Sequence, residues 1–240
     1  MSVLIVIPAR MKATRLPNKP MALIGGEPMI VQVWRRAMES KVGEVVVACD
    51  CDEIADAITD VGGRALLTDP DHPSGSDRIW EAVKREGGTH DIIINLQGDV
   101  PTLEPRLLRE LLSPLENLKV DIATLAAPIM RAEEHENPSV VKAVLALEKT
   151  GNIGRALYFT RCSAPYGEGI RYHHIGVYAY RRRALETFVS LPPSPLELRE
   201  KLEQLRALEA GLRIDAVVVD TVPLGVDTPE DLARANELLG

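Results

Sequence analysis

The sequence predicts a Rossmann-like three-layer α/β/α fold with a mostly parallel mixed sheet and a small inserted β-rich lobe. Short runs of Val, Ile and Leu alternate with amphipathic stretches of helical length in the first half of the chain. Parallel strands need such helical crossovers, and the helices then cover both faces of the sheet. With 240 residues, the chain can bury its core as a single domain, 1–240, in which residues from about 140 to 190 form the lobe.

The elements of the first half follow from local patterns. Apolar runs of four to eight residues predict buried strands, and longer stretches with one apolar face predict helices. We expect strands at 3–7, 44–48, 64–67, 91–96 and 121–128. We expect the intervening helices at 29–39, 53–61, 74–85 and 104–112.

The second half changes character. Longer strands are expected at 140–148 and 173–180, and we expect them to be antiparallel. Leucines at helical spacing predict one helix over 195–211, with Gly211 as its stop. A strand at 214–219 follows. Thr228 as N-cap and Pro229 at the first helical position then begin a final helix.

Composition excludes several classes of function. No apolar run approaches the roughly 20 residues that cross a bilayer, and the run at 3–7 is too short for a signal peptide. We therefore expect a cytoplasmic protein without membrane insertion. A net charge of -7 and an aromatic content of 4% argue against nucleic acid as a partner.

The loop at 8–19 is strongly basic. The only charged side chains before Glu27 are Arg10, Lys12, Arg15 and Lys19. Flexible cations and loop amides can surround several anionic oxygens, so this loop suits a polyphosphate. A solvated basic surface has the same composition, and charge alone does not separate the two interpretations.

Two aspartates follow predicted strands. Asp99 comes directly after Gly98 at the end of the strand at 91–96, and Asp227 precedes the final helix. Ligands in α/β sheets bind beyond the carboxyl ends of the strands. Carboxylates placed there suit Mg²⁺, which takes one or two of them together with phosphate oxygens. Turn formation by Asp99 and helix capping by Asp227 are the structural alternatives.

Eight segments in order carry a resemblance. They are IPAR at 7–10, TRLP at 14–17, HPSGSDR at 72–78, QGD at 97–99, ALYFTR at 156–161, HIGVY at 174–178, LEQLR at 202–206 and GVDTPED at 225–231. Together they resemble the acidic-sugar cytidylyltransferases over nearly the whole chain. The segments at 156–161 and 202–206 are similar to those of the 3-deoxy-manno-octulosonate (Kdo) cytidylyltransferases.

The resemblance implies a nucleotidyltransferase fold and an activity. Such an enzyme transfers CMP from CTP to Kdo, giving CMP-Kdo and diphosphate for lipopolysaccharide synthesis, with Mg²⁺ as cofactor and a homodimer as the assembly. The resemblance also implies that Lys19, Asp99 and Asp227 are catalytic and that the two aspartates bind the metal.

By the same resemblance, the substrates have separate sets of ligands. The nucleotide would contact Pro8, Ala9, Arg10, Arg15, Lys19, Ser74, Gly75, Arg78 and Gln97. The sugar would contact Arg161, His174, Tyr178, Glu203 and Gln204, with Arg161 on its carboxylate. Lys12 is expected to point to solvent. Taken singly, Ser74 also suits a helix cap, and Glu203 and Gln204 suit a solvated helix face.

Two departures from the family pattern affect the choice of sugar. Val100 replaces the glutamate that usually follows QGD, and the connection from Tyr166 to Tyr172 is short. A cytidylyltransferase for 8-amino-Kdo or for a sialic-acid-like sugar is therefore an alternative. A non-catalytic nucleotide-sensing module is a more remote one.

The region around Val177 and Leu196 is the surface we expect to pair subunits.

Overall fold

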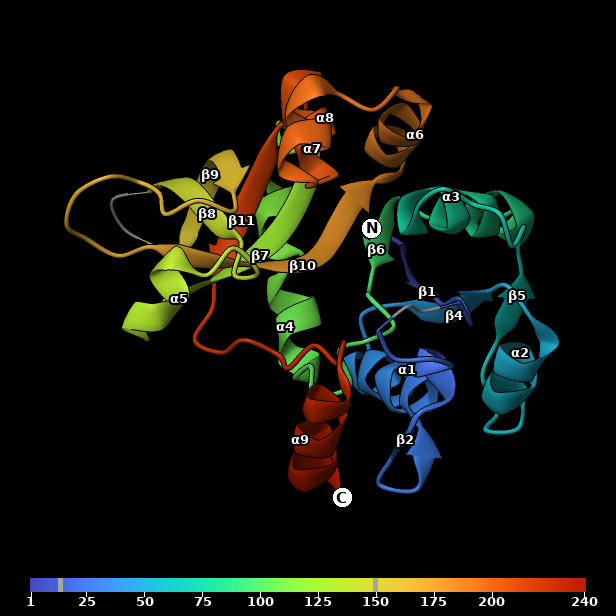
Figure 1. The fold of residues 1–240 in the computed structure, drawn as a ribbon. Coiled ribbons are helices and arrows are strands. Elements are labelled where there is room, and N and C mark those ends of the chain that lie inside the picture. The colour runs from blue at the N-terminus through green and yellow to red at the C-terminus, as the bar shows by residue number, and fades with distance from the viewer. Residues whose placement is uncertain (13–14, 149–150) are drawn as a thin grey trace. The chain divides into compact units, whose positions relative to one another are not determined.

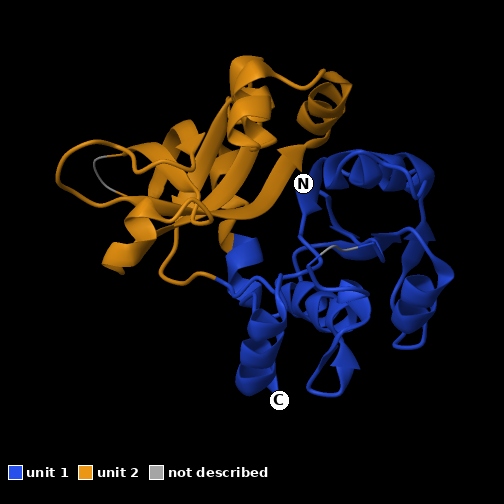
Figure 2. Ribbon diagram, in the orientation of Figure 1, with its two compact units in different colours: residues 1–109, 223–240 blue, residues 110–222 orange. Residues whose placement is uncertain are grey.

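The computed structural model describes residues 1–12, 15–148 and 151–240 (Figure 1). Thr14 of the TRLP motif lies outside the described residues. The chain divides into two compact units (Figure 2). Unit 1 comprises Met1–Arg109 and Pro223–Gly240, and unit 2 comprises Glu110–Val222. The single domain with a lobe at about 140–190 stays a prediction.

Unit 1 is built on parallel strands in the order β5-β4-β1-β6. They are β1 (Val3–Pro8), β4 (Glu44–Cys49), β5 (Ala65–Leu67) and β6 (Ile92–Asn95). Leu4 pairs with Glu44 on one side, and Val3 pairs with Ile92 on the other. The β1 side chains from Leu4 to Ile7 are fully buried, as expected of a strand covered on both faces.

Helices cover both faces of this sheet. Figure 1 shows α3 (Gly75–Glu86) on one face, and α1 (Met29–Ser40) and α2 (Asp52–Thr59) on the other. The predicted α/β class, with its three layers and mixed sheet, is confirmed. Unit 1 also contains a short hairpin of β2 (Leu23–Ile24) and β3 (Glu27–Pro28), the 3₁₀ turn η1 (Lys19–Met21), and α9 (Pro229–Leu239), while α4 (Pro105–Glu110) spans the boundary in the chain.

The last segment of the chain completes the core of unit 1. Val226 and Ala235 pack with Leu16, Ile24 and Met29 in one buried cluster. This packing fixes the start of α9 beside the loop that follows β1.

Unit 2 contains the strands of the second half. They run in the order β10-β7-β11-β9-β8. The first and last strands of this order, β10 and β8, also pair with each other. β7 and β11 are parallel, whereas the other pairs are antiparallel, as predicted for 140–148 and 173–180. The strands are β7 (Ile122–Pro128), β8 (Lys142–Leu147), β9 (Ile153–Thr160), β10 (Tyr172–Arg181) and β11 (Ile214–Val218).

Short helices complete unit 2, and one prediction there was wrong. They are η2 (Ser113–Glu116), α5 (Ala132–Glu136), α6 (Arg182–Ser190), α7 (Pro195–Glu200) and α8 (Gln204–Glu209). The expected helix over 195–211 is broken, because Lys201 adopts a left-handed conformation with φ 55° and ends α7. Within the described residues, no helix combines the length and apolarity that a bilayer crossing requires.

The proposed subunit-pairing surface also needs a correction. Val177 is only 1% exposed and belongs to the core of unit 2, so it is not available to a partner.

Candidate functional site

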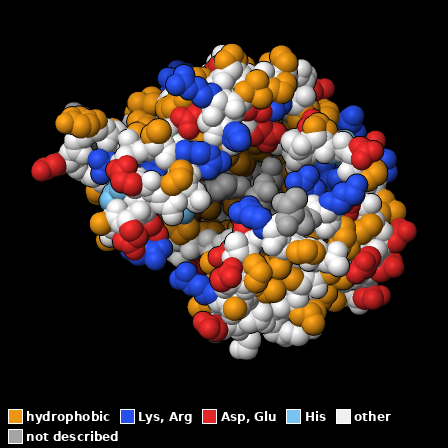
Figure 3. Space-filling view, viewed as in Figure 1, with side chains coloured by type: hydrophobic (Ala, Val, Ile, Leu, Met, Phe, Trp, Pro, Cys, Tyr) orange, Lys and Arg blue, Asp and Glu red, His pale blue; other side chains and the backbone are white. Residues whose placement is uncertain are grey.

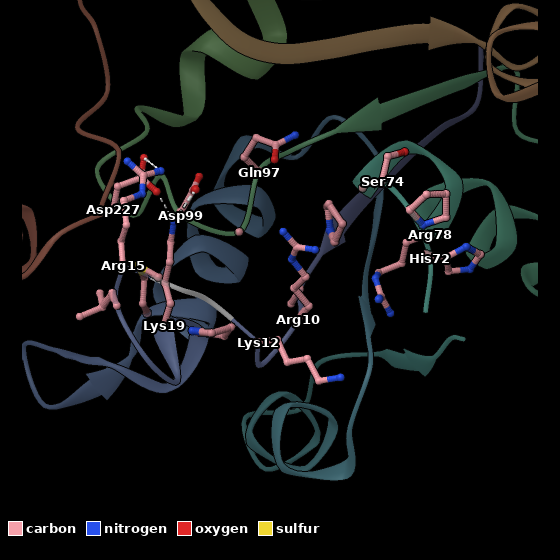
Figure 4. Close-up of a pocket in the computed structure, with 18 residues that line it drawn as sticks. Arg10, Lys12, Arg15, Lys19, His72, Ser74, Arg78, Gln97, Asp99 and Asp227 are labelled. Atoms are coloured by element: carbon pink, nitrogen blue, oxygen red, sulfur yellow. Dashed lines mark hydrogen bonds and ion pairs between the residues drawn. The ribbon is translucent and has the colours of Figure 1, made fainter. Parts of the chain in front are cut away.

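A cavity of about 330 Å³ opens in unit 1 at the carboxyl ends of its strands (Figure 4). Its walls come from the loops after β1 and β6 and from the starts of α3 and α9. All nine predicted nucleotide ligands line it, together with both aspartates: Pro8, Ala9, Arg10, Arg15, Lys19, Ser74, Gly75, Arg78, Gln97, Asp99 and Asp227. The structure therefore brings the basic loop and the carboxylates into one space.

Lys19 lies between the two aspartates. Its Nζ is 2.7 Å from Asp99 Oδ2 and 2.7 Å from Asp227 Oδ1. Burial opposes the charge of Lys19, but the two carboxylates prevail and raise its pKa. Burial likewise opposes the charge of Asp227, yet the contacts with Lys19 and Arg15 lower its pKa. Lys19 and Asp227 thus carry their charges at neutral pH.

Backbone contacts hold the two carboxylates in place. The amide of Val226 donates to the carbonyl of Asp99 over 2.8 Å. A Cβ on Gly98 would lie 3.0 Å from the carbonyl oxygen of Pro8, so a side chain there would push this loop away from β1. Thr228 and Asp231 form the capping box of α9, so Asp227 is not needed as the cap and its carboxylate faces the cavity.

The loop after β1 is anchored on its other side. The amide of Met11 donates to both carboxylate oxygens of Asp50, at 3.0 and 3.2 Å. Figure 4 shows Arg10 between the Lys19 group and the Ser74 side of the cavity. The amino group of Lys12 points away from Asp99 and Asp227 in that view, although Lys12 lines the rim.

The opposite wall is built by the start of α3. Ser74 caps this helix by accepting from the amide of Asp77, and it also lines the cavity, so the structural and functional interpretations are compatible. Arg78 is 3% exposed and donates to Thr68 Oγ1 and to the carbonyl of Pro70. Gln97 is oriented by a 2.9 Å hydrogen bond to Asn95.

Sequence reasoning overlooked His72. Its imidazole lines the same wall, and its Nε2 contacts the carboxylate of Glu81. Burial opposes the charge of Glu81, but hydrogen bonds from the Asp69 amide and His72 lower its pKa. The signal was available, because His72 opens the HPSGSDR segment.

The predicted sugar ligands all belong to unit 2. His174 and Tyr178 lie on one face of β10, with ring centroids 5.5 Å apart. Burial, with a further contribution from His173, lowers the pKa of His174 to about 3, so its ring is neutral. Burial and the nearby Glu203 raise the pKa of Tyr178, so the phenol keeps its proton.

Glu203 and Gln204 follow the break between α7 and α8. Gln204 is 7% exposed, so the alternative of a solvated helix face is wrong for this residue. Arg206 binds the carboxylate of Glu197 through two hydrogen bonds of 2.8 and 2.6 Å and lies 3.7 Å from Glu203. These contacts fix the start of α8.

The guanidinium of Arg161 donates hydrogen bonds to backbone carbonyls. Nε, Nη1 and Nη2 donate to the carbonyls of Glu200, Pro138 and Lys201 at 2.8, 2.9 and 3.3 Å. Of its five N–H groups, these contacts leave others for a ligand. Its binding of a sugar carboxylate stays a prediction.

Comparison with known proteins decides the family. Residues 4–214 match the cytidylyltransferase family. The chain belongs to this family. It is 60% identical over 238 residues to the 3-deoxy-manno-octulosonate cytidylyltransferase of Paramagnetospirillum magneticum, covering 98% of this chain and 97% of that one. The Parvibaculum lavamentivorans enzyme of the same name is 62% identical, with 98% and 92% covered.

Solved structures agree with this assignment. A CMP:2-keto-3-deoxy-manno-octonic acid synthetase in complex with CTP is 40% identical and superposes with a TM-score of 0.91, over 99% of this chain and 98% of that one. A cytidylyltransferase from Leptospira borgpetersenii, 18% identical with a TM-score of 0.63, covering 98% and 85%, shares the fold.

The carboxylates of this cytidylyltransferase suit a magnesium ion. Asp99 and Asp227 offer hard oxygen donors on either side of one amino group, at the mouth of strands where phosphates are expected. No cluster of three or more His, Cys, Asp or Glu ligands occurs in the described ranges 1–12, 15–148 and 151–240. Such a pair fits Mg²⁺ bound together with substrate phosphates, which supply the remaining ligands.

Proposed function

We propose that the protein transfers CMP from CTP to Kdo and releases diphosphate, as a cytoplasmic homodimeric enzyme of lipopolysaccharide synthesis. The observation that carries the proposal is the unit 1 cavity, in which Lys19 lies between Asp99 and Asp227 within a rim of arginines. The names of the full-length relatives support the choice of nucleotide and sugar.

The reaction needs positioning and charge neutralisation more than a covalent nucleophile. The anomeric hydroxyl oxygen of Kdo forms a bond to the α-phosphorus of CTP, and the bond from that phosphorus to the bridging oxygen breaks. The electron pair leaves with diphosphate, and the hydroxyl proton passes to solvent. Arg10, Arg15 and Lys19 neutralise the triphosphate while this charge moves.

Asp99 and Asp227 would hold Mg²⁺, which when bound neutralises phosphate charge and lowers the pKa of a coordinated hydroxyl. Lys19 then exchanges its contacts with the carboxylates for contacts with phosphate oxygens. Ser74, Gly75, Arg78 and Gln97 contact the nucleoside. In unit 2, His174, Tyr178, Glu203 and Gln204 bind sugar hydroxyls, and Arg161 is the candidate for the carboxylate.

A competition assay tests the proposal. The enzyme is mixed with CTP and Mg²⁺, and with Kdo, 8-amino-Kdo and a sialic acid, singly and in pairs, while diphosphate release is measured. We expect Kdo to have the highest kcat/KM and omission of Mg²⁺ to abolish turnover. Preference for another sugar would replace the substrate assignment, and CTP binding without turnover of any sugar would favour a nucleotide sensor.

A further inference from the structure

Thr124 lies in the core of unit 2 beside an irregularity in β10. The pairing of β10 with β7 shifts register between Ile175 and Tyr178. The Thr124 hydroxyl faces this shift, with Oγ1 2.9 Å from the carbonyl oxygen of Val177 and 3.2 Å from that of Ile175. The same Oγ1 is 3.1 Å from Nε2 of His174. Thr124 itself is fully buried.

These contacts determine where the hydroxyl proton goes. A hydroxyl has one proton to donate, and carbonyl oxygens can only accept. If the proton pointed to His174, two carbonyl oxygens would face the lone pairs of Oγ1 in a buried site. If it points to a carbonyl, preferably the nearer one of Val177, Oγ1 can accept from His174. The second arrangement makes two hydrogen bonds where the first makes one, so Nε2 of His174 carries a proton.

The imidazole is held firmly in this orientation. His174 is 7% exposed, and its ring lies edge-on to Phe159 with centroids 4.7 Å apart. Burial keeps the ring neutral, so a proton on Nε2 leaves Nδ1 without one. Among the residues that the structure describes, Nδ1 has no hydrogen-bond partner.

We propose that Thr124 is a positioning residue that locks His174 in the Nε2–H tautomer, so that Nδ1 accepts a hydrogen bond from a hydroxyl group of the sugar. This inference rests on the proposed function. It also determines which part of the substrate His174 contacts, because an acceptor nitrogen accepts a hydrogen bond from a hydroxyl group and repels a carboxylate oxygen. His174 therefore contacts the polyhydroxylated part of the substrate and not its acid group.

The test combines a spectroscopic and a kinetic measurement. Long-range ¹H–¹⁵N correlation spectra of the full-length protein report which ring nitrogen carries the proton, and His174→Gln identifies the His174 signals. We expect wild-type His174 to be protonated on Nε2 and its Nδ1 resonance to shift when Kdo is added. Thr124→Val should lose the tautomer preference and raise the KM for Kdo about tenfold, the effect of one lost hydrogen bond, with the KM for CTP unchanged.

Two further variants separate positioning from folding. Thr124→Ser keeps the hydroxyl and should retain both the tautomer and the KM for Kdo within about twofold. Ser40→Ala removes another buried hydroxyl, which donates to a carbonyl in unit 1, and should alter neither. If Thr124→Val does not fold, the wild-type and Thr124→Ser spectra still decide the question.

The opposite results would overturn the inference. They are a proton on Nδ1 in the wild type, or an unchanged KM for Kdo in folded Thr124→Val. Failure of the proposed function looks different, because wild-type enzyme would then release no diphosphate with Kdo whatever tautomer His174 adopts.

Discussion

At Lys19, one amino group contacts both carboxylates that we propose as metal ligands. The three side chains come from positions 80 and 208 residues apart, so only the folded chain assembles them. Their mutual neutralisation stabilises the charged forms before substrate arrives. In the proposed complex with CTP and Mg²⁺, Lys19 and the two carboxylates would each have a partner of opposite charge, so no charge would be left unpaired.

Asp99→Asn tests the role of the carboxylate. The amide keeps the shape of the side chain but loses the charge that a metal requires, so kcat should fall by at least about a hundredfold while the fold persists. Diphosphate release measures the first effect, and circular dichroism measures the second. Asp91→Asn is the matched control, because Asp91 precedes β6 whereas Asp99 follows it. Near-normal turnover by Asp99→Asn would remove this residue from the mechanism.

His174 predicts how stability depends on pH. Its pKa is lowered by burial from the ordinary 6.5 to about 3, so the unfolded chain takes up a proton that the folded chain does not. The contribution of His174 to the free energy of unfolding is therefore fully present above pH 6.5. This contribution falls toward pH 3 by at most about 1.4 kcal/mol per pH unit.

Urea unfolding between these pH values measures the effect. His174→Gln cannot titrate and should show a shallower decline. Parallel curves for wild type and His174→Gln would contradict the prediction.

At the scale of elements, the turn between α7 and α8 depends on Arg206. Its guanidinium binds Glu197, contacts the carbonyl of Leu191 and lies 5.1 Å from the centroid of the Phe188 ring. The ring series Phe188, Tyr180, Tyr178 and His174 continues from there along β10. A continuous series of guanidinium and ring contacts thus links the start of α8 to β10 within unit 2.

Arg206→Met should therefore destabilise the protein strongly. Removing Arg206 leaves the largely buried carboxylate of Glu197 with only the Ser194 amide among these contacts, and the loss should approach the roughly 3–5 kcal/mol of a broken buried pair. Arg35→Met is the control, because Arg35 binds Glu27 with the same two-point geometry at the surface, and its loss should cost about 1 kcal/mol or less. Denaturant titration of both variants makes the comparison, and equal losses would refute it.

The same region shows where sequence patterns stop being informative. The four parallel strands of unit 1 and the helices between them were predictable, because an unbroken apolar run such as that of β1 is stable only when both its faces are buried. The hairpin of β2 and β3 was not predicted. The break at Lys201 was not, since Leu202, Leu205 and Leu208 continue the helical spacing and a left-handed lysine has no sequence signal. The strand β9 was missed for a related reason, as Arg155 interrupts its apolar pattern.

For the candidate site, the sequence predicted which residues line the cavity better than it predicted the contacts between them. Every nucleotide ligand that the motifs predicted lines the cavity, but His72, which lines it too, was overlooked. The motifs did not predict that Lys19 would contact both aspartates, that Arg161 would bind three carbonyls, or that Thr124 would face His174. Such pairings depend on how distant segments pack, which local periodicity does not encode.

At the scale of the whole molecule, the net charge and the local charge at the cavity differ. The chain has a net charge of -7, and both signs are interspersed on the face seen in Figure 3. The cavity, in contrast, gathers Arg10, Lys12, Arg15, Lys19 and Arg78. Local field, and not net charge, therefore attracts the triphosphate.

Ionic strength tests this view. Raising NaCl from about 0.05 to about 0.5 M shortens the Debye length to a few ångströms, so the KM for CTP should rise several-fold. Inhibition by cytidine, which lacks phosphates, should stay nearly constant and serves as the control. A KM for CTP that does not respond to salt would mean that contact hydrogen bonds dominate binding.

The closure of unit 1 by its last segment has a consequence for synthesis of the chain. Arg10, Lys19 and Asp99 leave the ribosome long before Asp227, and Val226 and Ala235 are needed to cover Leu16 and Ile24. Unit 2 is translated in full before this happens. The cavity that we propose for the nucleotide is thus completed only after residues 226–235 have been translated.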